Sequence, residues 1–399
     1  MKITIQQWAW AAAVASAMAV AQGQSVEREG QYWARTAHTE PGRLSQQVRR
    51  LELFTRGNVV VKGSDDGTLQ VKLKQRVRAG SAEEATRFLG PVGRLGPFVA
   101  IGSVMRLELH AGTGDRVLTD LEITVPRQLG LLWVNNMAGG VEVYDIDGNV
   151  QADTAGGPIT IDRIRGSVQS HTGLGGMKIG TISGSLQCSS GGGSITLESA
   201  QGEVNCITGG GDVGVKYVGG ALVLSTEGGN IRVEKAGSTV RARSVAGVID
   251  VGQARGAVFA DTRGGSIQVG SSAGVRAESG GGTIRVKGGS GPMTVSTMMG
   301  SILAELMSGG RLGDSSLQAE SGDITVMIPA SLGLAVRARN ESGVSPRIIS
   351  DFPEIQVRSV GFKAPSAGPG VTGKGSLNGG GPVLDLNTNR GAIYLRRVK

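Results

Sequence analysis

Apolar residues recur along most of the chain as apolar-x-apolar triplets that repeat every 18 residues, from Val141/Val143 to Ile267/Val269. Later triplets follow at spacings of 17, 18 and 22 residues. A second apolar column, which includes Val150, keeps the same period, and glycine-rich turns separate the two columns. Two columns that stay in frame for so long predict a repeat protein with two short strands and two turns per repeat.

The length of the repeat favours one architecture. Eighteen residues are too few for a coil that contains a helix or for a four-stranded propeller blade, but they fit one rung of a single-stranded parallel β-solenoid (β-helix). Strand alternation places Val150, Ala152 and Thr154 inside the coil and Gln151 and Asp153 outside. The corner glycines allow positive φ angles and close passage between rungs. The sequence therefore predicts an all-β solenoid.

The N-terminal part of the chain departs from the repeat. Residues 22–130 are expected to form a β-rich cap that leads into the repeats of residues 131–343. Longer strands are predicted at Arg49 to Lys62, Leu69 to Arg78 and Met105 to His110, with a short helix from Ser81 to Leu89. Such a cap is needed because the end strand of a sheet has unpaired backbone groups.

The C-terminal region, residues 344–399, contains a Gly/Pro/Ser-rich segment, residues 363–382, which is predicted to be an insertion or loop. The repeat pattern then returns from Leu384 to Leu395, at the offsets seen from Val150 to Ile161. These last residues are expected to form a closing rung.

The first 21 residues resemble an export signal. They carry one charge at Lys2, an apolar stretch from Trp8 to Ala21 and small residues before the expected cleavage site. The apolar stretch is too short for a membrane anchor, and no other segment approaches spanning length. The mature chain is therefore expected outside the inner membrane, in the periplasm, on the outer surface or in the medium, without a transmembrane segment.

Composition limits the chemistry. Three histidines, two cysteines and 4% aromatic residues leave little for a metal centre or an aromatic pocket, so no cofactor and no metal are expected. The Gly-x-Gly strings lie between strands rather than before helices, which argues against a nucleotide site. The net charge of +8 permits contact with anionic polymers, although no nucleic-acid partner is expected.

The two cysteines, Cys188 and Cys206, share the column of Ala152 and should stack inside the coil. Export favours a disulfide. In-register parallel neighbours, however, keep their Cβ atoms about as far apart as their Cα atoms, beyond the usual disulfide mean of about 3.8 Å. Free, poorly reactive thiols are therefore expected, with a disulfide as the alternative.

Candidate chemistry lies in the outward columns. Asp261 and Glu278 occupy successive rungs beside Arg243, and paired carboxylates of this kind serve in polysaccharide-active β-helix enzymes. The competing interpretation is surface ion pairing of the carboxylates with Arg243 and Arg263. These three residues are the weak catalytic candidates, and ion pairing is the favoured interpretation.

Two further columns are polar. Gln151, Gln169, Gln187 and Asn205 form an outward amide column, expected to bond between rungs, with a polar strip for glycan contact as the alternative. The Thr/Ser column that includes Thr154 is expected to face inward and bond the backbone near the corner turn.

Three phrases resemble a known family. They are Leu121-Glu-Ile-Thr-Val-Pro126, Ser321-Gly-Asp-Ile-Thr-Val-Met-Ile-Pro329 and the Leu-x-Leu-x-Thr-x-x-Gly-x-Ile-x-Leu pattern of Leu384 to Leu395. The chain is similar over about residues 45–399 to the bacterial β-strand-repeat family called “putative adhesins”, whose function is unknown. The resemblance implies a repetitive β fold and no catalytic residue.

Two functions therefore remain open. The first is an exported, non-catalytic β-solenoid that acts as an adhesin or as an interaction or structural protein of the envelope. Its partners would be cell-surface glycans, envelope polymers or other proteins. The second is a polysaccharide-active hydrolase or lyase that uses the outward carboxylates. The first is expected because no convergent polar cluster is seen.

Overall fold

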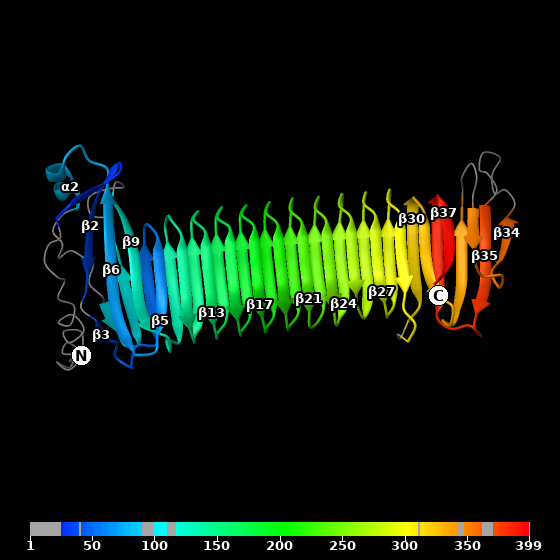
Figure 1. Cartoon of the computed structure of the whole chain (residues 1–399), viewed down its shortest axis with the longest axis horizontal. Coiled ribbons are helices and arrows are strands. Elements are labelled where there is room, and N and C mark those ends of the chain that lie inside the picture. The colour runs from blue at the N-terminus through cyan, green and yellow to red at the C-terminus, as the bar shows by residue number, and fades with distance from the viewer. Residues whose placement is uncertain are drawn as a thin grey trace, which may run out of the picture. The chain divides into compact units, whose positions relative to one another are not determined.

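The computed structural model describes residues 25–39, 41–89, 99–109, 117–309, 312–341, 347–360 and 370–398. The chain divides into two compact units, Met1–Gly202 and Glu203–Lys399, hereafter unit 1 and unit 2. Both are built from strands, and the predicted helix is present in unit 1 as α2 (Ala82–Leu89) (Figure 1). The all-β class is confirmed, whereas the export signal expected at Met1 to Ala21 lies outside the described residues.

Each repeat of unit 1 gives one strand to each of two sheets. The β10 sheet contains β10 (Leu131–Asn136), β12 (Asn149–Thr154), β14 (Val168–Thr172) and β16 (Leu186–Ser190). The β11 sheet contains β11 (Val141–Ile146), β13 (Ile159–Ile164), β15 (Met177–Ile182) and β17 (Ile195–Ala200). Pairing is parallel, and equivalent residues such as Val150 and Val168 are register partners. The parallel pairing expected from the period is therefore confirmed within the unit.

The repeat geometry extends into the predicted cap. The expected strand from Arg49 to Lys62 is in fact two strands, β4 (Arg50–Thr55) and β5 (Val59–Ser64), which pair in parallel with β10 and β11. Gly57 separates them with a φ of 139°, and a Cβ there would lie 2.4 Å from the carbonyl oxygen of Thr119. Only glycine fits this turn, so the single long strand predicted here was wrong.

Antiparallel strands cover the N-terminal end of unit 1. Strand β8 pairs in parallel with β4 and β9 pairs in parallel with β5, after which β7 and β6 add antiparallel partners. Strand β2 pairs antiparallel with β6, and α2 packs Ala85 and Leu89 against Val77. The elements are β1 (Glu27–Glu29), β2 (Tyr32–His38), β3 (Gly42–Arg43), β6 (Thr68–Val77), β7 (Val99–Ile101), β8 (Val104–Glu108) and β9 (Val117–Pro126).

Unit 2 has the same plan, with a β18 sheet and a β19 sheet whose strands lie side by side (Figure 1). The β18 sheet begins with β18 (Val204–Thr208), β20 (Leu222–Thr226), β22 (Val240–Ser244), β24 (Ala257–Thr262), β26 (Gly274–Ser279), β28 (Met293–Thr297) and β30 (Ser315–Ser321). The β19 sheet begins with β19 (Val213–Val218), β21 (Ile231–Ala236), β23 (Ile249–Ala254), β25 (Ile267–Ser271), β27 (Ile284–Gly289), β29 (Ile302–Leu306) and β31 (Ile324–Pro329).

The last residues of the chain form a rung, but this rung does not close unit 2. Strand β36 (Val383–Arg390) pairs in parallel with both β30 and β32 (Leu334–Asn340). Strand β37 (Ala392–Val398) likewise pairs with both β31 and β33 (Arg347–Ser350). The expected closing rung is therefore inserted between strands that precede it in sequence. Its repeat-like offsets match the register of β30, and register rather than chain order decides where a parallel strand pairs.

The segment predicted to be a loop, residues 363–382, is partly a strand. Strand β35 (Gly370–Leu377) pairs antiparallel with β32 and with β34 (Gln356–Val360), and thereby covers the open edge of β32. Its glycines permit close packing, because a Cβ at Gly375 would lie 2.3 Å from the carbonyl oxygen of Glu354. Composition therefore misled the prediction for residues 370–377, while residues 363–369 lie outside the described part.

The core follows the predicted faces. Val150, Ala152, Thr154, Ile159 and Ile161 are buried, and the residues between them are more exposed. The Thr/Ser column faces inward, as expected, and from Thr226 to Thr297 each hydroxyl joins two corner turns. In unit 2, Thr226 donates to the carbonyl of Gly211 (2.9 Å) and accepts from the N–H of Gly229 (3.1 Å). We call this arrangement the hydroxyl bracket.

Loss of one hydroxyl bracket should destabilise unit 2. Thr226→Val keeps the volume but leaves the Gly211 carbonyl and the Gly229 N–H without this partner, so we expect a loss of about 2 kcal/mol. Thr226→Ser should lose much less, because Ser244 makes the same two bonds one repeat later. Urea unfolding followed by circular dichroism measures both; equal stability of the Val and Ser variants would contradict the role of the bracket.

The corner glycines serve close passage rather than a positive φ. Gly229, Gly247 and Gly265 are not among the residues with positive φ, but a Cβ on each would lie within 2.1 Å of a carbonyl oxygen of the preceding turn. These corners therefore use the close passage that glycine allows and not its freedom to adopt a positive φ.

Both cysteines are disulfide-bonded, and no free cysteine is present among the described residues. The expectation of free thiols at Cys188 and Cys206 was therefore wrong. It assumed ideal strand geometry, in which Cβ atoms stay about 4.8 Å apart. Observed disulfides extend to a Cβ separation of about 4.5 Å, so the mean separation alone was too strict a criterion.

Candidate functional site

The outward side of the β18 sheet of unit 2 carries two neighbouring rows of side chains, which we call the polar face. Register pairing aligns each row from strand to strand. The first row contains Val223, Arg241, Phe259, Arg276, Thr294, Ser316, Asp385 and Arg337. The second row contains Ser225, Arg243, Asp261, Glu278, Ser296, Gln318, Asn387 and Arg339.

The three predicted catalytic candidates do meet on this face. Arg243, Asp261 and Glu278 are register partners on β22, β24 and β26. The Nε atom of Arg243 lies 4.0 Å from Oδ1 of Asp261, a loose ion pair. Glu278 pairs with Arg276 of its own strand, whose Nη2 and Nε atoms lie 2.9 and 3.1 Å from Oε1. The expected partner Arg263 is therefore replaced by Arg276, because residues two apart on a strand lie on the same side.

These carboxylates lack the surroundings of an acid/base pair. The side chains of Asp261 and Glu278 are 53% and 44% exposed, and a guanidinium faces each of them. A general acid that works near neutral pH needs burial or a neighbouring negative charge to keep its proton. The arrangement neutralises charge and offers hydrogen-bonding edges to solvent.

A stacked cation and aromatic ring lie beside them. The Cζ atom of Arg241 is 4.5 Å from the ring centroid of Phe259, a cation–π distance. Within the described residues, no carboxylate lies within ion-pair distance of Arg241. Together with Arg243, Arg276 and Glu278 these side chains line a shallow hollow of about 330 Å³. The sequence placed Arg241 in the same outward column as the amides, but nothing in it revealed the stacking.

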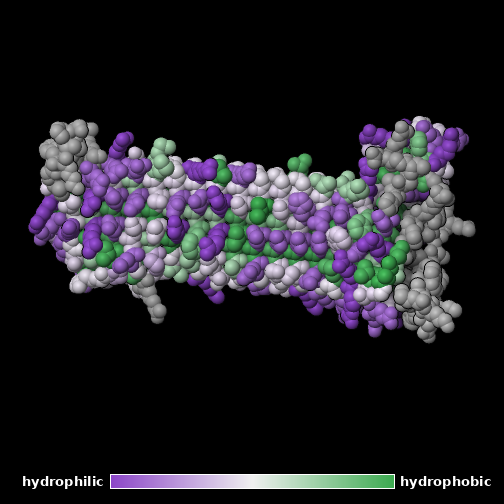
Figure 2. All heavy atoms as spheres, turned by 180° about the vertical axis from the view of Figure 1, so that it is seen from behind, coloured by the Kyte–Doolittle hydropathy of each residue, from purple (hydrophilic) through white to green (hydrophobic). Residues whose placement is uncertain are grey.

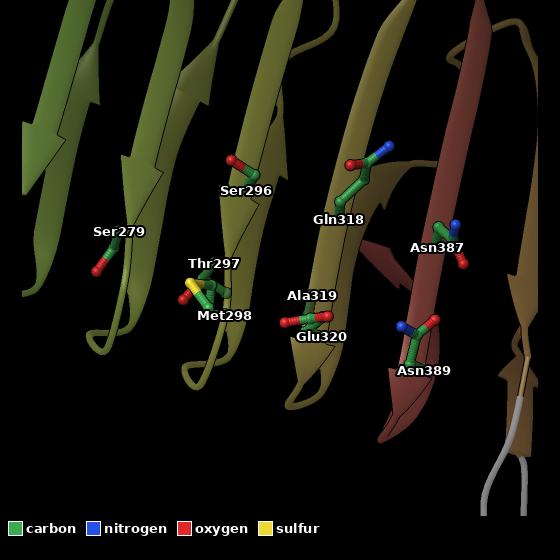
Figure 3. Close-up of a pocket in the computed structure, with 9 residues that line it drawn as sticks. All are labelled: Ser279, Ser296, Thr297, Met298, Gln318, Ala319, Glu320, Asn387 and Asn389. Atoms are coloured by element: carbon green, nitrogen blue, oxygen red, sulfur yellow. The ribbon is translucent and has the colours of Figure 1, made fainter. Parts of the chain in front are cut away.

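A second hollow, of about 320 Å³, lies farther along the polar face. Figure 3 shows Ser296, Gln318 and Asn387 on three neighbouring strands along one side of it. Ala319 of β30 is the register partner of Thr297 of β28. Because alanine is smaller than threonine, its side chain fills less space beside the hollow. The hollow offers neutral donors and acceptors beside the charged part of the face.

The far strands of the polar face carry four cations. Arg337 of β32 is the register partner of Lys374 of β35, and Arg339 is aligned through Thr372 with Arg358 of β34. Arg339 pairs with Glu341 at 3.4 Å. In the described part of unit 2, neither Arg337 nor Lys374 has a carboxylate within ion-pair distance, although Asp385 is the other register neighbour of Arg337. Like charges on opposite residues repel, so this pair favours an anion from outside.

Unit 1 contains a different charged hollow, of about 480 Å³, next to Lys62 and Glu122. There Arg163 donates to both carboxylate oxygens of Asp145, at 2.7 and 2.8 Å. These bonds lower the pKa of Asp145 and raise the pKa of Arg163. Because both groups are charged at neutral pH and satisfy each other, the pair fixes the turn and offers no proton for catalysis.

The face drawn in Figure 2 carries hydrophilic side chains interspersed with apolar ones. Across the described ranges, no helix combines the length and apolar character needed to cross a membrane. In the same ranges, no three His, Cys, Asp or Glu side chains are placed to hold a metal ion.

Comparison with known proteins gives two structural matches. No protein-family profile and no curated protein sequence matches the chain. A “putative cell adhesion protein” from Clostridium sporogenes ATCC 15579 aligns with 8% identity over 92% of this chain and 100% of that chain, at a TM-score of 0.19. A “putative adhesin” from Bacteroides fragilis NCTC 9343 aligns with 11% identity over 94% and 100%, at a TM-score of 0.21.

Proposed function

We propose that the chain is an exported, non-catalytic β-solenoid that acts in the manner of an adhesin and binds an acidic polymer of a cell envelope. Support for the solenoid comes from the repeats, each of which gives one strand to each of two parallel ladders in either unit. Support for export comes from the apolar, small-residue character of Met1 to Ala21.

We infer an acidic ligand from a set of cations on the polar face that have no carboxylate partner. The members of this set among the described residues are Arg241, Arg337, Lys374 and Arg358. Between them lie the neutral groups of Ser296, Gln318 and Asn387, which can bond the hydroxyls of a polymer. Parallel strands present equivalent positions about every 4.8 Å. An extended chain with regularly spaced carboxylate groups fits such a face.

Binding fits this face better than turnover. A polysaccharide lyase or hydrolase would need a general base or acid aimed at the bound chain, and Asp261 and Glu278 instead face arginines while half exposed to solvent. No contact on the polar face favours the enzymatic alternative.

Binding of fluorescein-labelled polygalacturonate, followed by fluorescence anisotropy, tests the proposal. We expect wild-type protein to bind at low salt, to weaken steadily as NaCl is added, and to leave the polymer length unchanged. Arg337→Gln with Lys374→Gln should weaken binding about tenfold, because each exposed ionic contact is worth about 0.5–1 kcal/mol.

The matched control is Arg285→Gln with Lys287→Gln, which removes the same charge from exposed positions of the β19 sheet. Equal weakening by both double variants would contradict a site on the polar face. Cleavage of the polymer that disappears in Asp261→Asn or Glu278→Gln would contradict the absence of catalysis.

A further inference from the structure

The outward side of the β10 sheet in unit 1 differs from the polar face of unit 2. It combines two aromatic rings with amide, carboxylate and imidazole groups, and we call it the amide–aromatic face. Its register-aligned rows extend over five strands, from β4 to β16. One row contains Glu52, Trp133, Gln151, Gln169 and Gln187, and the other contains Phe54, Asn135, Asp153, His171 and Ser189.

The aromatic end of this face is rigidly held. The rings of Phe54 and Trp133 meet edge to face with centroids 5.2 Å apart. The Trp133 indole N–H donates to Oδ2 of Asp153 at 3.1 Å, which fixes the ring plane. The guanidinium of Arg50 lies over the Trp133 ring, 5.4 Å from its centroid, and that of Arg106 lies over the Phe54 ring, 5.1 Å from its centroid. Both aromatic residues are only partly buried, so the ring surface that the arginines leave open faces solvent. Rings held in this way lose little conformational entropy when a ligand packs on them.

Asp153 has capacity left for a ligand. It accepts from Trp133 and from Nε2 of Gln151, both at 3.1 Å, and both bonds go to Oδ2. No hydrogen bond to Oδ1 is found among the residues described in unit 1. A carboxylate whose one oxygen is anchored presents the other as an oriented acceptor.

The amides of this face do not bond to one another. The expected hydrogen-bonded ladder would join Gln151 to Gln169 and Gln169 to Gln187, but neither bond is found in the described part of unit 1, and Gln151 bonds Asp153 instead. Gln169, His171 and Gln187 are exposed. The interpretation of this column as a structural ladder was therefore wrong within unit 1, and its donors and acceptors are available to a ligand.

The charges of the face balance and give an anionic ligand no net attraction. Glu52 is 4% exposed and pairs with both nearby cations, at 2.7 Å from Arg50 and 2.6 Å from Arg106. This group of three keeps one positive charge, which offsets the negative charge of Asp153 in the middle of the face. A negatively charged polymer therefore gains no net attraction here, unlike on the polar face of unit 2.

We propose that the amide–aromatic face binds a neutral glycan chain, with sugar rings against Trp133 and Phe54 and sugar hydroxyls on Asp153, Gln169 and Gln187. A sugar ring has an apolar C–H face that packs on aromatic surface, while its hydroxyls need partners that both donate and accept, as amides do. Four strand spacings give the face a length of about 19 Å, enough for a short oligosaccharide. This goes beyond the proposed function because it assigns a second ligand class to a separate face.

Isothermal titration of the full chain with cellohexaose, laminarihexaose and mannohexaose tests this site. We expect at least one of the three to bind, with a Kd that changes less than about twofold between low and high NaCl, because no ion pair forms. Gln169→Ala with Gln187→Ala should weaken binding by about tenfold through loss of two ligand hydrogen bonds. Both residues are exposed, so folding should be unaffected.

Two further variants separate binding from folding. Trp133→Ala should abolish binding, whereas Trp133→Phe, which keeps a ring beside Phe54, should retain part of it. Gln201→Ala with Gln253→Ala removes two exposed amides outside the face and should bind like wild type.

The outcomes separate this inference from the proposed function. Failure of all three hexasaccharides to bind, an affinity that falls with salt, or equal affinity of the Gln169/Gln187 variant and its control would each overturn the neutral-glycan site. Polygalacturonate binding to unit 2 would be untouched by these results, because it depends on Arg337 and Lys374.

Discussion

Replacement of Ile231 by Asp is expected to destabilise unit 2 by about 4 kcal/mol or more, because it buries a charge without a partner. The side chain of Ile231 is 0% exposed. Its register partners on β19 and β23 are Val213 and Ile249, which are also buried and cannot hydrogen-bond a carboxylate. Since the position and both of its register partners are buried, solvent does not reach the introduced charge.

The matched control introduces the same residue at an exposed position of the same strand. Lys235→Asp should change the free energy of unfolding by no more than about 0.5 kcal/mol, as is usual for surface substitutions. Urea unfolding followed by circular dichroism gives both values. If Ile231→Asp unfolds at the same urea concentration as Lys235→Asp, the inward assignment of this column is wrong.

The alternation around Ile231 explains how much of the fold could be predicted. A strand side chain can point only to one of two sides, so Ile231 and Val233 inside imply Arg232 outside. Because the period is fixed, the same assignment holds in every repeat. Both the core and the parallel register could therefore be predicted from the sequence. The same reasoning correctly placed Thr226 inside, where its hydroxyl bonds two turns.

The place of the last rung among the other strands could not be predicted from the repeat period. The offsets of Leu384 to Leu395 match a repeat, and they correctly predicted strands. A parallel strand can pair on either side of any register-matched neighbour, so the offsets do not say that β36 lies between β30 and β32. That choice depends on β35, which covers the far edge of β32 and leaves the near edge for β36.

For the candidate sites, too, the sequence predicted which residues share a row but not which side chains pair. The period brought Arg243, Asp261 and Glu278 into one row, but partner choice depends on side-chain rotamers. Glu278 accordingly pairs with Arg276 along its own strand. The basic pair of Arg337 and Lys374 depends on the antiparallel pairing of β32 with β35, a segment whose glycines predicted a loop.

Gly265→Ala is the second substitution with a large expected effect, and it tests why the chain contains 67 glycines. A Cβ at Gly265 would lie 1.9 Å from the carbonyl oxygen of Gly247, so one backbone segment must move. That carbonyl also accepts from the Thr262 hydroxyl (3.2 Å), and the Gly265 N–H donates to the same hydroxyl (3.1 Å). The methyl group therefore collides with backbone and breaks a hydroxyl bracket, for an expected loss of about 3 kcal/mol or more.

The neighbouring residue provides the control for this substitution. Gly264 lies in the same turn, but the nearest atom to its Cβ position is 3.9 Å away. Gly264→Ala should therefore be neutral or stabilising by up to about 1 kcal/mol, because alanine reduces the entropy of the unfolded chain. Thermal and urea unfolding of the two variants give the comparison. Similar losses in both would mean that these glycines are needed for backbone flexibility, whereas a loss confined to Gly265→Ala is expected if close passage between successive turns requires them.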